Sequence, residues 1–297
     1  MRYRITHATT YGYSEPVSLC HNLTHLTPRA TEWQQVLETT LDVAPAPAVT
    51  VNRGDYFGNP AVFFTIQDPH RELVVTATSE VEVLRRFPPD PARTPPWEDV
   101  AEQLKISTHP DWLDAAQFTH DSPFIAAGAD LAAFAAPSFP AGRPVLQGVC
   151  DLTARVFHEF AYDPRATTLA TPLREVLANR RGVCQDFAHL QIGALRSLGL
   201  AARYVSGYLR TSPPPGQKRL VGADASHAWV SVFVPGVGWA DLDPTNNLTV
   251  NDHHVLLAWG RDYDDVSPIK GVILGGGRHR MAVTVDVEPL DEPGTPA

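Results

Sequence analysis

The sequence predicts an α+β protein with a β-sandwich at residues 1–86, a proline-rich linker at 87–97 and an α+β core with a C-terminal strand at 98–297. Short alternating apolar runs precede the linker, and helical patterns followed by strands come after it. At 297 residues the chain is long enough for two domains.

The first 86 residues have the pattern of a small β-sandwich. Their strand-like segments are rich in β-branched residues and partly alternating, and turn signals such as Gly58-Asn59-Pro60 separate them. These segments are 2–6, 37–43, 61–66 and 73–83. We find no catalytic motif among them.

Residues 87–97 are too dense in proline to form a helix or a strand ladder, so they are expected to be a stiff linker. The pattern then becomes helical and afterwards returns to strands. The expected helices are 125–136, 147–160, 172–181 and 184–198, and the expected strands are 201–209, 227–234, 239–243 and 280–287.

Composition excludes several classes of function. The net charge is −9 and the chain has no basic run, which argues against a nucleic-acid partner. The N-terminus has no signal-like apolar stretch, and no segment approaches 18 apolar residues, so we expect a cytoplasmic protein without a membrane partner. Three scattered cysteines do not make a disulfide framework.

Cys184 is the most informative cysteine because it precedes an apolar helical face. Phe187, Leu190 and Leu198 lie on that face, and Gly182 favours a turn just before the helix. A helix N-terminus stabilises an anion by up to ~2 kcal/mol. That is not enough for a thiolate at neutral pH, so a histidine cation is also needed.

A hairpin downstream supplies that histidine and an acid. His227 begins the strand at 227–234, and Asp243 ends the return strand at 239–243. Their side chains share a face when paired residue numbers have an even sum. Pairing 232 with 238 makes them directly opposite, and pairing 234 with 238 makes them diagonal; both allow a hydrogen bond.

Each of these residues also has an ordinary structural explanation. A cysteine is commonly a small packing residue, and we assign that role to Cys20 and Cys150. His227 alone could be a strand-end residue, and Asp243 alone a turn residue before proline. Together, however, Cys184, His227 and Asp243 form a nucleophile, base and orienting acid.

Several segments around these residues resemble the bacterial transglutaminase-like superfamily, in the branch with a transglutaminase-like N-terminal region. They are GVCQDFAHL (182–190), LGLAARYVSGYL (198–209), SHAWVSVFVPGVGWADLDPTNN (226–247) and GRDYDDVSPIKGV (260–272), with FGNPAVFFTI and PHRELVVTATSEVEV nearer the N-terminus. The resemblance covers nearly the whole chain. It implies a papain-like core in which the nucleophile is Cys184, the base His227 and the acid Asp243.

The resemblance leaves the oxyanion site incomplete. Papain-type enzymes carry a glutamine shortly before the nucleophile, but position 178 here is alanine. The backbone N–H of Cys184 is one expected donor. Tyr162 is a candidate for the second.

Three functions remain open, with a peptide or protein as the expected partner. The first is hydrolysis of an amide through a Cys184 thioester, as in a cysteine peptidase or amidase; it is favoured because residues 211–218 have the polar composition of an open rim. The second is acyl transfer from glutamine to an amine, and the third a non-catalytic binding or assembly role. We expect no cofactor, and no metal site, because the histidines lack ligand spacing.

Overall fold

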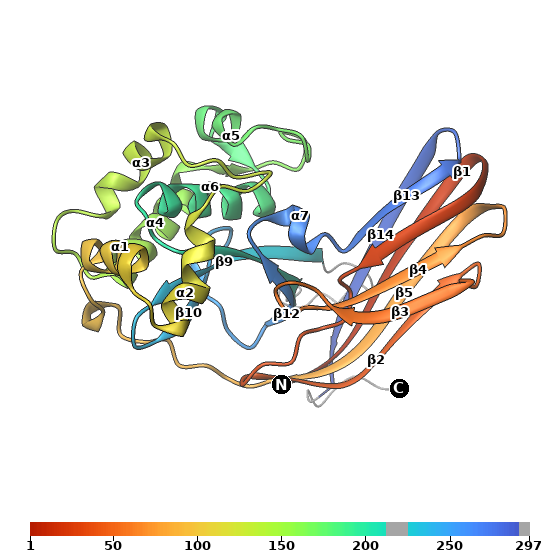
Figure 1. The fold of residues 1–297 in the computed structure, drawn as a ribbon, viewed down its shortest axis with the longest axis horizontal. Helices are drawn as coiled ribbons and strands as arrows, with labels where there is room; N and C mark the ends of the chain where they lie inside the picture. The colour runs from red at the N-terminus through yellow and green to blue at the C-terminus, as the bar shows by residue number, and fades with distance from the viewer. Residues whose placement is uncertain (212–224, 291–297) are drawn as a thin grey trace, which may run out of the picture.

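The computed structural model describes residues 1–211 and 225–290. Helices, a five-stranded sheet and a seven-stranded sheet follow one another across the molecule (Figure 1). Within the described residues, no helix is both long and apolar enough to cross a membrane.

The seven-stranded sheet is built from both ends of the chain. β1 (Arg2–Thr24) pairs antiparallel with β4 and β5 on one side and with β13 and β14 on the other. β2 and β3 pair with β5 and β4. The bounds are β2 (Gln34–Ala44), β3 (Val49–Gly54), β4 (Pro60–Ile66), β5 (His70–Val83), β13 (Ile269–Gly275) and β14 (His279–Pro289).

This sheet bends in the middle of β1. Between Gly12 and Val17 the register shifts, and the neighbours of β1 change from β5 to β4 and from β14 to β13. Figure 1 shows β1 and the β13–β14 pair changing direction at the same end of the sheet. The region is all-β, but it forms one hydrogen-bonded sheet where the sequence predicted a sandwich. The reason is that β1, 23 residues long, runs through both halves.

The C-terminal strands belong to this sheet, although the sequence-based division grouped them with the core at 98–297. Gly275, Gly276 and Gly277 all have positive φ, which glycine adopts without strain, and they let the chain bulge between β13 and β14. Both strands can therefore follow β1 along its whole length.

The described chain has seven α-helices, of which six lie between β5 and β8 in the sequence and the seventh follows β12. They are α1 (Trp97–Ile106), α2 (Pro110–Ala116), α3 (Ala129–Ala135), α4 (Val145–Glu159), α5 (Leu173–Asn179), α6 (Cys184–Ser197) and α7 (Tyr263–Val266). Short 3-10 helices occupy Pro91–Arg93, Gln117–Thr119 and Ala136–Ser138. The linker runs from the end of β5 to the start of α1.

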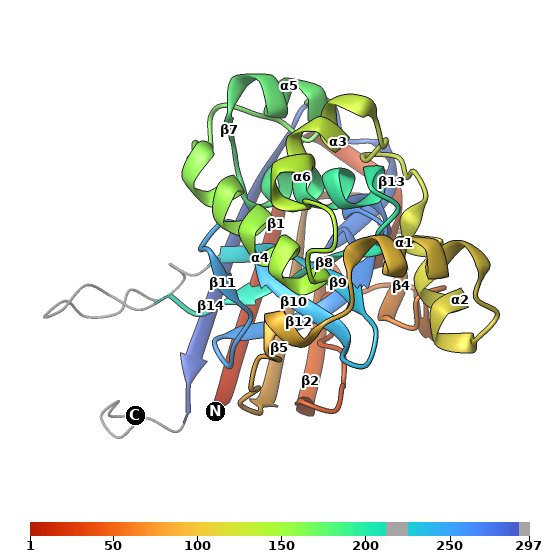
Figure 2. The same ribbon diagram turned by 90° about the vertical axis from the view of Figure 1, so that its left-hand side faces the viewer.

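The five-stranded sheet is antiparallel, in the order β11-β10-β9-β8-β12. Its strands are β8 (Ala202–Leu209), β9 (Ala225–Val234), β10 (Gly238–Asp243), β11 (Leu248–Thr249) and β12 (His254–Gly260), and a separate parallel pair joins β6 (Ala161–Tyr162) to β7 (Arg181–Gly182). Helix α6 packs against β8 and β9, and Figure 2 shows the helices in front of these strands.

The two sheet regions share one apolar core. Tyr3 and Ile5 of β1 and Val287 of β14 are buried in the same cluster as Phe187 of α6 and Val230 of β9. The seven-stranded sheet is therefore held against the α+β core by burial of apolar side chains, which brings β1 and β14 next to the start of α6.

Candidate active site

Helix α6 begins at Cys184, as the sequence predicted. The Asp186 carboxylate fixes this start, because its Oδ2 accepts hydrogen bonds from the Val183 N–H at 2.8 Å and from the Thr167 hydroxyl at 2.6 Å. A Cβ at position 182 would lie 2.7 Å from the same oxygen, so Gly182 leaves the room that Asp186 needs. Cys184 itself remains partly exposed.

The β9–β10 hairpin brings His227 to Asp243. Val234 pairs with Gly238, one of the two registers that the sequence allowed, and this pairing makes the two residues diagonal neighbours. His227 Nε2 donates to Asp243 Oδ2 at 2.8 Å. Both side chains are buried, so the contact is shielded from water.

Cys184 completes the set, because it lies beside His227 in the same cavity and interacts with its imidazole. Because Nε2 of the imidazole faces Asp243, Nδ1 is the nitrogen left for the thiol. Burial alone would lower the pKa of His227, but hydrogen bonds and charge interactions with Asp243 and Cys184 raise it to about 10. The imidazole is therefore protonated at neutral pH, as a thiolate–imidazolium pair requires.

Asp243 is held by five hydrogen bonds. Oδ1 accepts from the backbone N–H groups of Thr245 at 2.9 Å and Asn246 at 3.2 Å. Oδ2 accepts from His227, from the Asn246 side chain at 2.7 Å and from His254 Nε2 at 3.2 Å. Burial would raise the pKa of this carboxyl, but hydrogen bonds from both histidines hold it well below its ordinary value.

The sequence reasoning did not find His254 or Asn246. His254 begins β12, and burial lowers its pKa despite the hydrogen bond to Asp243, so it donates as a neutral imidazole. The ring of Trp229 contacts it edge-on, with centroids 5.4 Å apart. The DPTNN segment after β10 offered a signal for Asn246, since side-chain amides commonly bond within turns. No local signal marked His254.

His227, Asp243 and His254 also form, among the described residues, a set whose ligand atoms all lie within 4.8 Å of one another. Two imidazoles and a carboxylate are suitable ligands for a divalent cation. The spacing of the histidines in the sequence had argued against a metal site. Spacing could not reveal this set, because its three residues come from three different strands. In the structure their facing atoms hydrogen-bond to one another.

A cavity of about 430 Å³ opens at Cys184 and His227. The seven-stranded sheet supplies one wall of it, with His7, Thr9 and Tyr11 from β1 and Met281, Val283 and Val285 from β14. The sequence had shown no chemistry in the N-terminal strands, but they help to shape the site. The segment at 211–218, expected to form a rim, lies from residue 212 onward outside the described residues.

Two family descriptions match this chain. The bacterial transglutaminase-like N-terminal region matches residues 3–82, and the transglutaminase-like superfamily core matches residues 135–244, which include Cys184, His227 and Asp243. The uncharacterized protein Rv2569c of Mycobacterium tuberculosis is 40% identical over 301 residues, covering 98% of this chain and 93% of the relative.

The chain belongs to the transglutaminase-like superfamily. The uncharacterized protein ML0607 of Mycobacterium leprae is 32% identical over 293 residues, covering 97% of this chain and 99% of the relative. The protein-glutamine gamma-glutamyltransferase of Pseudomonas aeruginosa is 33% identical over 102 residues, which cover 32% of this chain and 15% of that protein.

The fold of this chain is also seen in a solved structure. A Cytophaga hutchinsonii protein described as a candidate cysteine protease superimposes with a TM-score of 0.78 at 22% identity, covering 100% of this chain and 93% of that one. At this identity the likeness concerns the fold. Fold and family together support thiol-dependent chemistry in general terms.

Proposed function

We propose that this protein cleaves amide bonds by nucleophilic catalysis, with Cys184 as nucleophile, His227 as acid and base and Asp243 as the acid that orients His227. The observation that carries the proposal is the placement of Cys184 beside His227 in one cavity, with His227 hydrogen-bonded in turn to the buried Asp243. A buried thiol with only a packing role needs no such partners.

In the proposed reaction the Cys184 thiolate attacks the carbonyl carbon of the amide. The C–N bond breaks as His227 transfers its Nδ1 proton to the leaving nitrogen, which gives an amine and a thioester. Water then attacks the thioester, and His227 takes a proton from it. The Cys184–carbonyl bond breaks, releasing a carboxylic acid and restoring the thiolate–imidazolium pair.

Negative charge on the carbonyl oxygen needs donors during both steps. The backbone N–H of Cys184 is at the first turn of α6 and is suited to this role. We assign the second donor to Tyr162, which pairs with Gly182 in the β6–β7 ladder. Tyr162 is 58% exposed, and its partial desolvation together with the nearby Cys184 raises the pKa of its phenol, which therefore keeps its proton.

Acyl transfer to an amine is the alternative reaction of the same thioester. It is favoured by the partial match to a glutamyltransferase described above. Hydrolysis is favoured by concentration, since water at roughly 55 M outcompetes an amine that the site does not bind. The cavity wall of Met281 and Val283 is apolar, and none of the described residues that line the cavity carries a carboxylate to hold a lysine ammonium.

Intact-mass analysis separates these reactions. The protein is incubated with a glutamine-containing donor peptide, with and without a primary amine, and the mass of the peptide is then measured by mass spectrometry. We expect mainly deamidated or cleaved peptide in both samples, and unchanged peptide with Cys184→Ala. If the amine captures most of the acyl group, transfer replaces hydrolysis as the reaction; if neither product forms with any donor peptide, the catalytic proposal fails.

A further inference from the structure

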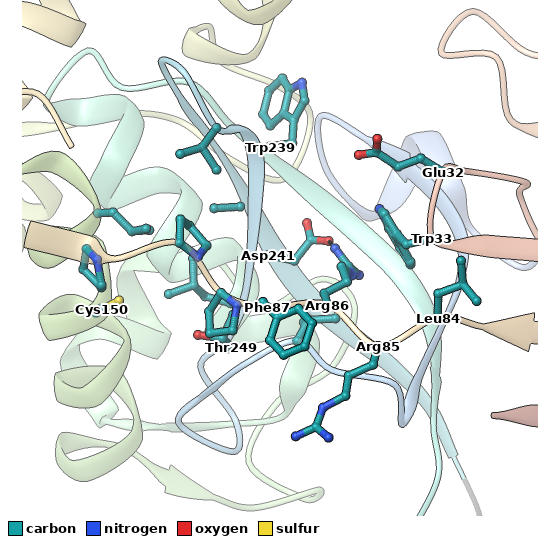
Figure 3. A pocket seen from close by; sticks show the side chains of 18 residues that line it. Glu32, Trp33, Leu84, Arg85, Arg86, Phe87, Cys150, Trp239, Asp241 and Thr249 are labelled. Atoms are coloured by element: carbon teal, nitrogen blue, oxygen red, sulfur yellow. Dashed lines mark hydrogen bonds and ion pairs between the residues drawn. The ribbon is translucent and has the colours of Figure 1, made fainter. Parts of the chain in front are cut away.

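A second cavity, of about 560 Å³, lies where the linker, α4 and the β10–β11 hairpin meet. Figure 3 shows Trp33, Arg86, Phe87, Asp241 and Cys150 around it. None of the residues that line it also lines the cavity at Cys184. The proposed reaction therefore makes no use of this space.

An incompletely paired Arg86–Asp241 ion pair lies in the middle of this cavity. Arg86 Nη1 donates to Asp241 Oδ2 at 2.8 Å, the contact drawn in Figure 3. Asp241 is only 7% exposed, and its Oδ1 has no hydrogen-bond partner among the described residues. Nε and Nη2 of Arg86 likewise have no hydrogen-bond partner in the described part of the chain.

Unpaired polar atoms at a buried position are costly, so this arrangement indicates a ligand that pairs with them. Arg85 and Arg86 balance Glu32 and Asp241 in the lining, so the lining carries no net formal charge and favours neither an anion nor a cation. A neutral group with one donor and one acceptor satisfies both side chains of the ion pair. An amide has this character: its N–H suits Asp241 Oδ1, and its C=O suits the free N–H groups of Arg86.

The rest of the wall is aromatic and aliphatic. The Arg86 guanidinium stacks 3.2 Å from the ring centre of Trp33, which holds both side chains in place. Trp239 and Phe87 extend the apolar surface, together with Leu84, Leu146, Val237, Leu242 and Val250. A ligand with an apolar side chain next to its amide therefore fits the whole lining.

We propose that this cavity binds a peptide segment through one neutral backbone amide at Arg86 and Asp241 and an adjacent apolar side chain against Trp33, Phe87 and Trp239. The site is distinct from the catalytic cavity, and its occupancy does not depend on the reaction proposed for Cys184.

Cys150 provides a direct measurement, because it lines the cavity on α4 (Figure 3). In Cys184→Ala protein the remaining thiols are Cys150 and Cys20, of which Cys20 is fully buried. Burial raises the pKa of the Cys150 thiol, so maleimide labelling is followed at alkaline pH by peptide mass spectrometry. The probe is N-acetyl-L-phenylalanine amide.

We expect the probe to protect Cys150, with labelling slowed about tenfold when its concentration is about ten times its Kd. N-acetyl-L-phenylalanine, which carries a carboxylate in place of the amide, should protect at much higher concentrations only. Absence of protection by the amide at tens of millimolar, stronger protection by the acid, or equal protection of Cys20 would each overturn the proposal. The comparison needs no change in the cavity itself.

Variants then assign the polar contacts. In Asp241→Asn a single side-chain oxygen must accept hydrogen bonds from both Arg86 and the ligand, so the protection of Cys150 by the probe should weaken at least tenfold. Arg86→Lys should weaken it by a similar factor. Glu32→Gln, in the lining of the same cavity, is the matched control, and in this variant the probe should protect Cys150 as before. Circular dichroism checks the fold of each variant. Unchanged protection in folded Asp241→Asn and Arg86→Lys proteins would refute the assignment.

Discussion

At the scale of single residues, the three thiols of this chain are expected to differ in reactivity. Cys184 is partly exposed and interacts with His227, whose raised pKa keeps the imidazole protonated at neutral pH. Burial raises the pKa of Cys20 and of Cys150. Iodoacetamide near pH 6.5 should therefore label Cys184 well before the other two, as peptide mapping at partial labelling would show. Equal labelling of all three would argue against a catalytic thiolate.

Asp243 is expected to orient His227 without taking its proton. Asp243→Asn should keep the fold, because the turn N–H groups still find an oxygen, but should cut turnover by on the order of 10³. Cys184→Ala and His227→Ala should be at least as severe, and the losses should not add. Turnover is measured with the donor peptide. Activity of Asp243→Asn within about threefold of the wild type would show that Asp243 does not hold this role.

The pH dependence follows from His227. Its pKa is raised to about 10, so the imidazolium is present below that pH and is lost as pH rises through it. The Asp243 pKa lies below its ordinary value, so that carboxylate is lost only in strong acid. We expect kcat/KM to be flat across neutral pH and to fall near pH 10. A fall centred near pH 6.5, the ordinary value for histidine, would contradict the ion pair.

The proposed catalytic residues were identifiable in the sequence because each carries a local signal: a helix start for Cys184, and a hairpin for His227 and Asp243. His254 was not, because β12 lies at the far edge of the sheet from β10, with β9 and β8 between them. Its contact with Asp243 depends on the path of the chain after β11, which the sequence does not specify. Long-range contacts of this kind lack periodicity and motif spacing.

At the scale of elements, the start of α6 depends on the close approach of Gly182 and Asp186. In Gly182→Ala the new Cβ would lie 2.7 Å from Asp186 Oδ2, so the hydrogen bonds to Val183 and Thr167 must distort. We expect a loss of about 1–2 kcal/mol in the free energy of unfolding, measured in urea. Activity should also fall, because Cys184 is displaced.

The control for this change is Gly54→Ala at the end of β3. No atom lies within 4 Å of a Cβ at that position, and its φ is not in the left-handed region. Its free energy of unfolding should change by less than about 0.5 kcal/mol. Equal effects at positions 54 and 182 would show that Asp186 does not define the helix start.

Helices and strands with clear periodicity were found close to their observed bounds. Helix α6, expected at 184–198, spans Cys184–Ser197, and β10, expected at 239–243, spans Gly238–Asp243. β13 was missed because its apolar side chains Val272 and Leu274 are largely exposed, so it lacks the alternation of a half-buried strand. Pairing with β1 defines β13, and pairing partners are invisible in a local pattern.

At the scale of the whole molecule, the seven-stranded sheet forms part of the cavity at Cys184. β14 reaches it because the glycine bulge lets the C-terminal strands follow β1, and β14 then presents Met281, Val283 and Val285 to the space at Cys184. No sequence pattern joined the two ends of the chain to one another. The cavity is therefore a product of the complete fold, and changes in β14 should alter substrate binding.

Met281 provides the test of this arrangement. Its side chain is 60% exposed and lines the cavity, so Met281→Asp should leave the thermal midpoint nearly unchanged. A charge beside the proposed acyl site should raise KM for an apolar donor peptide about tenfold or more, with a smaller effect on kcat. Val272→Asp is the matched control, because Val272 is 68% exposed on β13 and does not line this cavity. If both variants change KM alike, the effect is one of general surface charge, and the wall formed by β14 does not contact the substrate.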